Sequence, residues 1–399
     1  MRSACYVLPV PVQIAESVAV APPSLPPARP AFCAPLAVVF VLEAEIGVAP
    51  GRPPPVSLGG PTDRRLGSLL PVTMAGSWGY GRLVLGCGTF GGIGGSANLV
   101  GRGLDERSAF ATMDEAVGLG VTLFDTAESY AGGASEIMIG RWLAERDSSI
   151  TDRVRLATKV APPNVDGRDG RFDAAFLEQK FSGSLQRLGV DTVEFLLTHA
   201  PDDGTPIEHT LEGLEAIRSS GRCRYLGACN VDAGQLTAAL DAAERLGISG
   251  YQVVQNGYSL LRPQDDGIVR SICSERNLAF TPYSPLAGGA LTGKYQRDVS
   301  PPPDSRLALR PDGVDELLTA AVYDAIDRLR SDAERRHGVD CGALALAWLL
   351  HRTDVTAVIT GPARRSPHLG LAAAAADIVL PDADFAEIEM WFTSAATGE

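Results

Sequence analysis

The sequence predicts an α/β protein of the (β/α)8 TIM barrel class, and three observations lead to this prediction. From about Leu83 onward, short apolar runs alternate with longer amphipathic stretches. Several amphipathic stretches end at a glycine, as helices commonly do (Gly120, Gly189, Gly221 and Gly247). The alternation yields eight strands, and eight strand–helix units are the number that closes such a barrel.

The elements follow in order along the chain. Strands are predicted at residues 83–86, 122–125, 155–159, 193–198, 223–228, 251–255, 279–283 and 356–359. Helices are predicted between them at residues 108–119, 135–143, 174–188, 207–219, 232–246 and 268–276. The eighth unit is irregular, with a proline-rich loop, helices at 314–337 and 341–351, and an extra C-terminal helix at 382–393 outside the barrel.

Residues 1–73 do not continue this alternation. They hold half of the chain's 28 prolines, and proline fixes φ and removes a backbone donor. We therefore expect a disordered, Pro/Ala-rich extension over 1–73 and a barrel domain over 74–399. A secretory signal fits poorly, because Pro9 and Pro11 interrupt the early apolar stretch.

Composition excludes several classes of function. A net charge of −13 and a pI near 4.9 argue against a nucleic-acid partner. The longest apolar runs, such as residues 36–42, are far shorter than the roughly 18 residues of a membrane span, so no membrane partner is expected. The 7 cysteines are odd in number and scattered without C-x-x-C, which suggests no disulfide framework and no metal site. A cytoplasmic protein fits best.

Polar residues stand where the predicted strands end. In such barrels the active site lies at the C-terminal ends of the strands, so these side chains should share one rim. Tyr130 follows the second strand by one loop. The strand-end residues, in chain order, are Asp125, Lys159, His199, Asn230, Gln255, Asn256 and Tyr283.

Four of these residues suit proton transfer to a carbonyl oxygen while a hydride reaches its carbon. A lysine beside the Tyr130 phenol would bring the pKa of that phenol, ordinarily near 10, toward neutrality. Asp125 would keep Lys159 charged, and a neutral His199 would orient the carbonyl. Taken singly, each residue has a structural explanation, such as a solvated lysine or a packing histidine. Their joint placement on successive strand ends favours catalysis.

The same residues carry a resemblance to the aldo-keto reductases over roughly residues 80–395. Phe124-Asp-Thr-Ala-Glu-Ser-Tyr130 and Leu197-Thr-His199 are among the matching stretches, with residues 85–91, 157–159, 227–230, 254–258 and 282–289. The resemblance implies that Tyr130 is the general acid, that Lys159 and Asp125 tune it, and that His199 orients the substrate.

The resemblance also implies a nicotinamide cofactor. Asn230 and Gln255 would bind its carboxamide, and Tyr283 would stack on its ring. The loop from Ser284 to Leu291 would cover the pyrophosphate, with Lys294 nearby, and the loop after the eighth strand would meet the adenosine 2′-phosphate. The remaining cofactor residues implied in these two loops are Pro285, Leu286, Gly288, Gly361, Arg364 and Arg365, and the loop after the first strand adds Gly88 and Thr89.

Two departures from the family pattern concern the cofactor. Cys229 replaces a serine before Asn230, and an alanine-rich run at 371–376 replaces a Glu-Asn pair that holds adenine in many members. NADPH remains the expected cofactor because arginine pairs well with a phosphate, and NADH stays open. A Rossmann interpretation of Gly86-Cys-Gly-Thr-Phe-Gly91 is rejected, because no helix opens at its third glycine.

The sequence thus predicts an NADPH-dependent oxidoreductase acting on a small-molecule aldehyde, ketone or alcohol. The alternative is a cofactor-binding regulatory subunit resembling channel β subunits, with little turnover. Substrate identity and oligomeric state are left open.

Overall fold

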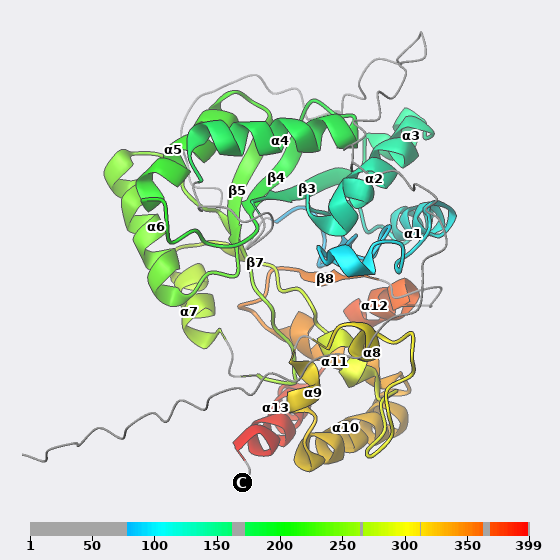
Figure 1. Cartoon of the computed structure of the whole chain (residues 1–399). Coiled ribbons are helices and arrows are strands. Elements are labelled where there is room, and N and C mark those ends of the chain that lie inside the picture. Colours follow the sequence, from blue (N-terminus) through cyan, green and yellow to red (C-terminus); the bar gives the residue numbers. More distant parts are fainter. Residues whose placement is uncertain (1–77, 162–171, 264–265, 312, 362–367, 398–399) are drawn as a thin grey trace, which may run out of the picture. The chain divides into compact units, whose positions relative to one another are not determined.

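Eight parallel strands form one sheet in a computed structural model, which describes residues 78–161, 172–263, 266–311, 313–361 and 368–397 (Figure 1). The strands follow the order β7-β6-β5-β4-β3-β2-β1-β8, and every neighbouring pair is parallel. They are β1 (Leu83–Gly86), β2 (Leu123–Asp125), β3 (Arg155–Val160), β4 (Val193–Thr198), β5 (Cys223–Cys229), β6 (Val253–Gln255), β7 (Ala279–Phe280) and β8 (Val358–Thr360). The predicted (β/α)8 class is confirmed.

Backbone hydrogen bonds also join the two ends of this strand order. The amide of Thr356 donates to the carbonyl oxygen of Phe280 over 2.8 Å. The amide of Ile359 donates to the carbonyl oxygen of Pro282 over 3.0 Å. The seventh strand is shorter than its predicted range of 279–283, because Pro282 has no N–H to donate to the ladder. Tyr283 nevertheless pairs with the segment after β6 through a bridge to Gly257.

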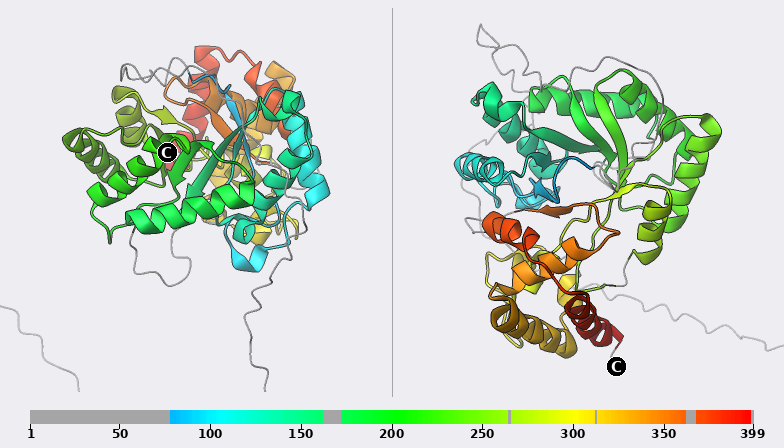
Figure 2. Two further views of the ribbon diagram at one scale, coloured as in Figure 1. Left: turned by 90° about the horizontal axis from the view of Figure 1, so that it is seen from above. Right: turned by 180° about the vertical axis from the view of Figure 1, so that it is seen from behind.

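Helices pack around the strands (Figures 1 and 2). Aspartates cap four of them: Asp105, Asp147, Asp173 and Asp232 each accept a hydrogen bond from a backbone amide of the first turn. Because Asp105 is the cap, α1 begins two residues before the predicted Ser108. The helices after the first six strands are α1 (Glu106–Gly118), α2 (Ala134–Ala144), α3 (Ser148–Thr151), α4 (Ala174–Leu188), α5 (Ile207–Ser219), α6 (Ala233–Leu246) and α7 (Gly267–Glu275).

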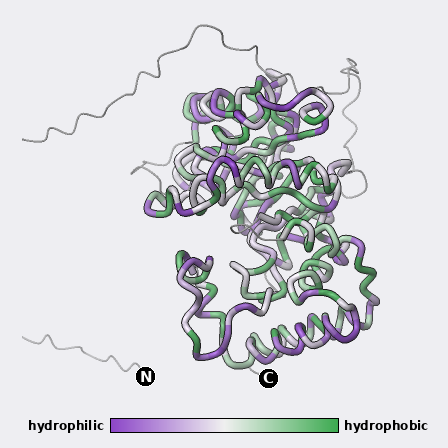
Figure 3. The backbone as a smooth tube through the Cα atoms, turned by 90° about the vertical axis from the view of Figure 1, so that its right-hand side faces the viewer, coloured by the Kyte–Doolittle hydropathy of each residue, from purple (hydrophilic) through white to green (hydrophobic). Residues whose placement is uncertain are grey.

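Two hydrophobic layers hold the strands and helices together. The larger lies between the sheet and the helices, and several helices alternate in hydropathy along their length as one-sided burial requires (Figure 3). The smaller fills the inside of the barrel, where Phe195 and Tyr225 stack with ring centroids 5.3 Å apart. Trp78 stacks on Phe195 at 5.2 Å, so residues just before β1 cover the N-terminal end of this core.

The irregular eighth unit differs from its prediction in its helices: two of them, Arg306–Leu309 and His368–Ala376, were not predicted, and one predicted helix is broken. The single helix expected at 314–337 is wrong, because the chain leaves helical geometry at Leu318 (ψ of 61°) and Thr319 caps a new helix through its side chain. The segment comprises α9 (Val314–Leu317), α10 (Ala320–Asp332) and a π-helical turn (Ala333–His337). The other late helices are α8 (Arg306–Leu309), α11 (Cys341–His351), α12 (His368–Ala376) and α13 (Asp382–Thr397).

The expected boundary between an extension and a barrel at residues 73 and 74 lies outside the described residues. Within the described ranges, no helix is both long and apolar enough to cross a membrane.

Candidate active site

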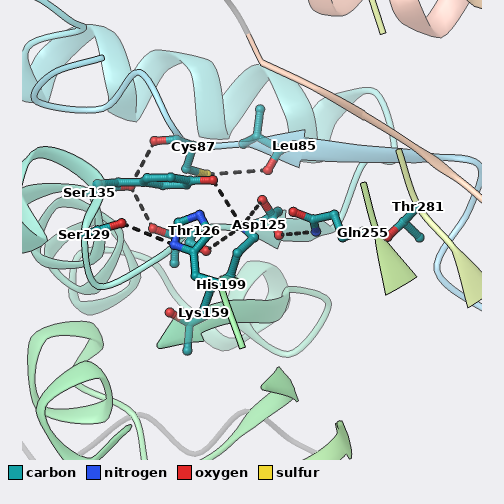
Figure 4. Close-up of polar contacts among 12 residues, drawn as sticks. Leu85, Cys87, Asp125, Thr126, Ser129, Ser135, Lys159, His199, Gln255 and Thr281 are labelled. Carbon is teal, nitrogen blue, oxygen red and sulfur yellow. Dashed lines mark hydrogen bonds and ion pairs between the residues drawn. The ribbon is translucent and has the colours of Figure 1, made fainter. Parts of the chain in front are cut away.

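Three of the predicted catalytic residues, Asp125, Lys159 and His199, meet at the carboxyl ends of neighbouring strands (Figure 4). Asp125 ends β2, Lys159 lies one residue before the end of β3, and His199 follows β4 directly. Tyr130 begins the short turn η2 (Tyr130–Gly133), where Ala131 takes a left-handed φ of 50°. The structure therefore gathers Asp125, Tyr130, Lys159 and His199 at one rim, although they are spread over the sequence from residue 125 to residue 199.

Lys159 is the centre of this group. Its ammonium nitrogen lies 2.6 Å from Oδ2 of Asp125, 2.9 Å from the carbonyl oxygen of Thr126 and 3.2 Å from the hydroxyl of Tyr130. Its side chain is 1 % exposed. Burial is the largest single effect and lowers the pKa of Lys159, but the charges and hydrogen bond that face it, from Asp125 above all, together raise that pKa above its ordinary value. Lys159 is thus a cation held directly beside the phenol.

The phenol of Tyr130 stays protonated in the neutral range. Burial raises the pKa of Tyr130 to about 12, and the Lys159 cation lowers it only in part. The expectation that the lysine would bring this pKa toward neutrality is therefore wrong for this structure, because loss of hydration outweighs the cation. Gly88 packs against the ring: a Cβ at Gly88 would lie 3.6 Å from ring carbons of Tyr130.

His199 is neutral, as expected. Burial together with the nearby Lys159 cation lowers the pKa of His199 to about 3. Its ring meets the Tyr130 ring edge-on, with centroids 5.5 Å apart. A neutral imidazole at this position has one nitrogen available as a hydrogen-bond donor.

Gln255 and Asn230, which were predicted to bind the nicotinamide carboxamide, contact two of the predicted catalytic residues, Asp125 and His199. Nε2 of Gln255 donates to Oδ1 of Asp125 over 3.0 Å, and Gln255 is 4 % exposed. Nδ2 of Asn230 donates to the carbonyl of His199 over 2.9 Å, and its Oδ1 accepts from the hydroxyl of Tyr283 over 2.7 Å. The site of the predicted cofactor and the proton-handling residues thus form one connected network.

The loop after β7 has features that fit an anionic cofactor group. Ser284 has a φ of 54°, and Gly288 and Gly289 within η3 (Ala287–Thr292) have φ of 63° and 92°. A Cβ at Gly289 would lie 2.5 Å from the ammonium nitrogen of Lys294, so a side chain there would displace the lysine as well as strain the positive φ. Pro285 and Leu286 connect these positions. A cation beside a glycine-rich turn suits a pyrophosphate.

The remaining predicted cofactor residues lie in the loops after β1 and β8. Gly88 and Thr89 are half-buried beside the site. Gly361 follows β8 and approaches β1 closely, since a Cβ there would lie 2.6 Å from the carbonyl oxygen of Gly86. Arg364 and Arg365 lie outside the described residues.

Sequence reasoning missed several polar neighbours of the site. Oγ of Ser129 lies 3.3 Å from Nδ1 of His199, and Oγ of Ser135 lies 2.8 Å from Oγ1 of Thr126 (Figure 4). The carboxylate of Glu128 accepts from the amide of Ala161 over 2.8 Å. Ser129 adjoins Tyr130 in sequence, which was the one available signal, but its contact depends on the turn geometry.

Comparison with known proteins agrees with this arrangement. The model of the Aldo/keto reductase family matches residues 82–391. The chain is 32 % identical over 271 residues to a probable voltage-gated potassium channel subunit beta from Arabidopsis thaliana, covering 67 % of this chain and 81 % of that protein. It is 33 % identical over 268 residues to the uncharacterized oxidoreductase YrpG from Bacillus subtilis, covering 65 % of this chain and 79 % of that protein.

A third relative has a named activity. The chain is 28 % identical over 308 residues to the NADH-specific methylglyoxal reductase of Escherichia coli, covering 70 % of this chain and 86 % of that protein. Since the family model spans most of the chain and includes every strand of the barrel, the chain belongs to the aldo/keto reductase family and is an NAD(P)H-dependent reductase.

Proposed function

We propose that this protein reduces the carbonyl group of a small aldehyde or ketone with NADPH, or oxidises the corresponding alcohol, and that Tyr130 is the general acid. The observation that supports this most is the contact of the Lys159 ammonium with both Asp125 and the Tyr130 hydroxyl, at 2.6 Å and 3.2 Å. A cation held this way stabilises the phenolate that remains after the phenol gives up its proton.

Each residue has one part in the proposed reaction. NADPH supplies a hydride to the carbonyl carbon when it is bound. Tyr130 donates its proton to the carbonyl oxygen, and Lys159 stabilises the resulting negative charge. Asp125 keeps Lys159 charged and in place. Because the pKa of His199 is about 3, its ring is neutral and hydrogen-bonds the carbonyl oxygen without competing as an acid.

The cofactor is proposed to lie along the rim from β5 to β8. Asn230 and Gln255 bind the carboxamide, and Tyr283 stacks on the nicotinamide ring. Ser284, Pro285, Leu286, Gly288 and Lys294 surround the pyrophosphate, and Gly88 and Thr89 line the cofactor from the first loop. The loop after β8, with Gly361, Arg364 and Arg365, is proposed to bind the adenosine 2′-phosphate.

Preference for NADPH over NADH rests on Arg364 and Arg365 in the sequence. The name of the Escherichia coli relative, an NADH-specific reductase, supports keeping NADH as the alternative. Dissociation constants for NADPH and NADH decide between them. The double substitution of Arg364 and Arg365 to alanine should weaken NADPH binding and leave NADH binding unchanged.

A regulatory role is the second candidate, because the similarity to plant channel β subunits is as high as that to named oxidoreductases. In that role the chain binds cofactor and a partner and turns over slowly. The experiment is NADPH oxidation by the purified protein with a broad panel of aldehydes and ketones. Rapid turnover of any carbonyl supports the reductase, whereas tight cofactor binding with no turnover across the panel supports the regulatory role.

A further inference from the structure

The backbone of His199 is fixed on both sides. Its amide donates to the carbonyl oxygen of Val160 over 2.8 Å, and its own carbonyl accepts from Nδ2 of Asn230 over 2.9 Å. With the backbone fixed, only the ring's rotation and the position of its single proton remain to be set. Those two properties depend on what the ring nitrogens contact.

Ser129 is the side chain that contacts Nδ1 of His199, over 3.3 Å. The loop after β1 leaves room for this contact, since a Cβ at Gly95 would lie 3.2 Å from Oγ of Ser129. The imidazole also meets the Tyr130 ring edge-on, with ring centroids 5.5 Å apart. The ring thus contacts both the hydroxyl of Ser129 and the ring of the proposed general acid.

The proton of a neutral imidazole resides on one nitrogen, and the other nitrogen accepts. A serine hydroxyl can either donate or accept, so the contact with Ser129 allows both tautomers. The proposed reaction needs only one of them. A carbonyl oxygen that gains negative charge is stabilised by a donor, and Nε2 can donate to it only if Nδ1 is the acceptor.

We propose that Ser129 is a positioning residue: its hydroxyl donates to Nδ1 of His199 and thereby keeps the proton on Nε2, facing the substrate oxygen. This inference rests on the proposed reductase function, because the need for a donor at Nε2 comes from the reaction. It assigns Ser129 no contact with substrate. The role is to select which of two imidazole forms the site presents.

The direct test is the tautomer of His199, read by nuclear magnetic resonance of protein labelled with 15N-histidine. The chain has 5 histidines, and the His199→Gln variant identifies the signals of His199. In the wild-type protein near pH 7 we expect a neutral ring with an unprotonated Nδ1 and a protonated Nε2. In Ser129→Ala we expect an increased fraction of the form protonated at Nδ1. This readout requires neither turnover nor cofactor.

Kinetics provide the second readout. Loss of one neutral hydrogen bond should lower kcat/KM for a carbonyl substrate by about 3- to 10-fold in Ser129→Ala. Ser129→Thr keeps a hydroxyl and should recover both the tautomer and most of the rate. Ser135→Ala is the matched control, because its hydroxyl contacts Thr126 and the carbonyl of Cys87 instead of His199. It should leave the tautomer unchanged.

Two results overturn the inference. One is a wild-type His199 protonated at Nδ1. The other is a ring protonated at Nε2 whose tautomer and kcat/KM stay the same in Ser129→Ala. Failure of the proposed function is distinguishable, because it appears as retained turnover in Tyr130→Phe, whatever the tautomer of His199.

Discussion

The ammonium of Lys159 lies 2.6 Å from Oδ2 of Asp125, and both side chains are buried where β2 and β3 end. The two residues are 34 positions apart, and the parallel pairing of β2 with β3 brings them together. A buried charge is stable only with a partner, so each residue depends on the other. The same pair also places a cation beside the Tyr130 hydroxyl.

Lys159→Met should therefore damage both stability and activity. It leaves Asp125 without its cation, which should lower the free energy of unfolding by about 3–5 kcal/mol. It should also lower turnover by about 10²- to 10⁴-fold, because the phenolate loses its stabilising charge. Chemical denaturation and steady-state kinetics measure the two effects. The double variant Asp125→Asn with Lys159→Met should regain most of the stability and none of the activity; recovery of activity would remove Lys159 from the mechanism.

Gln255 links the expected cofactor site to Asp125, so its replacement should have two consequences. In Gln255→Leu, Oδ1 of Asp125 loses a donor, and the free energy of unfolding should fall by about 1–3 kcal/mol. Cofactor binding, measured by fluorescence titration, should weaken as well. Gln252→Leu is the control, because Gln252 contacts the backbone amide of Leu226 and should not affect cofactor binding. Unchanged affinity in Gln255→Leu would separate this residue from the cofactor.

The buried carboxylate of Glu136 joins three elements without touching the site. It accepts from Nε of Arg187 over 2.7 Å and from the hydroxyl of Thr158, and it is 0 % exposed. Glu136→Gln should lower the free energy of unfolding by about 2–4 kcal/mol, because it weakens a buried ion pair. Glu106 pairs with Arg141 at the same distance of 2.7 Å, but on the surface. Glu106→Gln should change stability by less than about 1 kcal/mol, and equal losses in both variants would contradict this account.

Acid should destabilise the protein through His199. The pKa of His199 is about 3 in the folded protein, against an ordinary value of 6.5. Between these values the unfolded chain binds a proton that the folded protein does not bind, so stability falls as pH decreases from about 6.5 toward 3. Between pH 7 and 4 this contributes a loss of about 2–3 kcal/mol. His199→Gln should lose correspondingly less stability over the same range, as denaturation at both pH values would show, whereas parallel pH profiles would contradict a buried neutral ring.

The barrel and its strand-end residues could be predicted because they follow local rules. Each strand is a short apolar run, and a polar residue such as Asp125 or Lys159 at its end interrupts that pattern visibly. The alternation of strands and helices then dictates that these ends share a rim. The helix α4 was predicted to the residue, since Asp173 and Gly189 mark its two ends chemically.

Other features depend on the folded arrangement, which the sequence pattern does not specify. The break at Leu318 and Thr319 lies inside an amphipathic pattern that runs on without interruption. The contact of Ser129 with His199 depends on the left-handed turn that follows at Ala131. The pKa of Tyr130 is set by the burial of its ring, which composition and spacing do not report.

The central claim is that Tyr130 supplies the proton, and Tyr130→Phe tests it most directly. The substitution removes one hydroxyl and keeps the ring that packs on Gly88, so the barrel and the cofactor site should be preserved. We expect turnover to fall by at least about 100-fold, with the dissociation constant for NADPH changed by less than about twofold. A variant that keeps its rate, with or without weakened NADPH binding, would contradict the assignment of Tyr130 as the general acid.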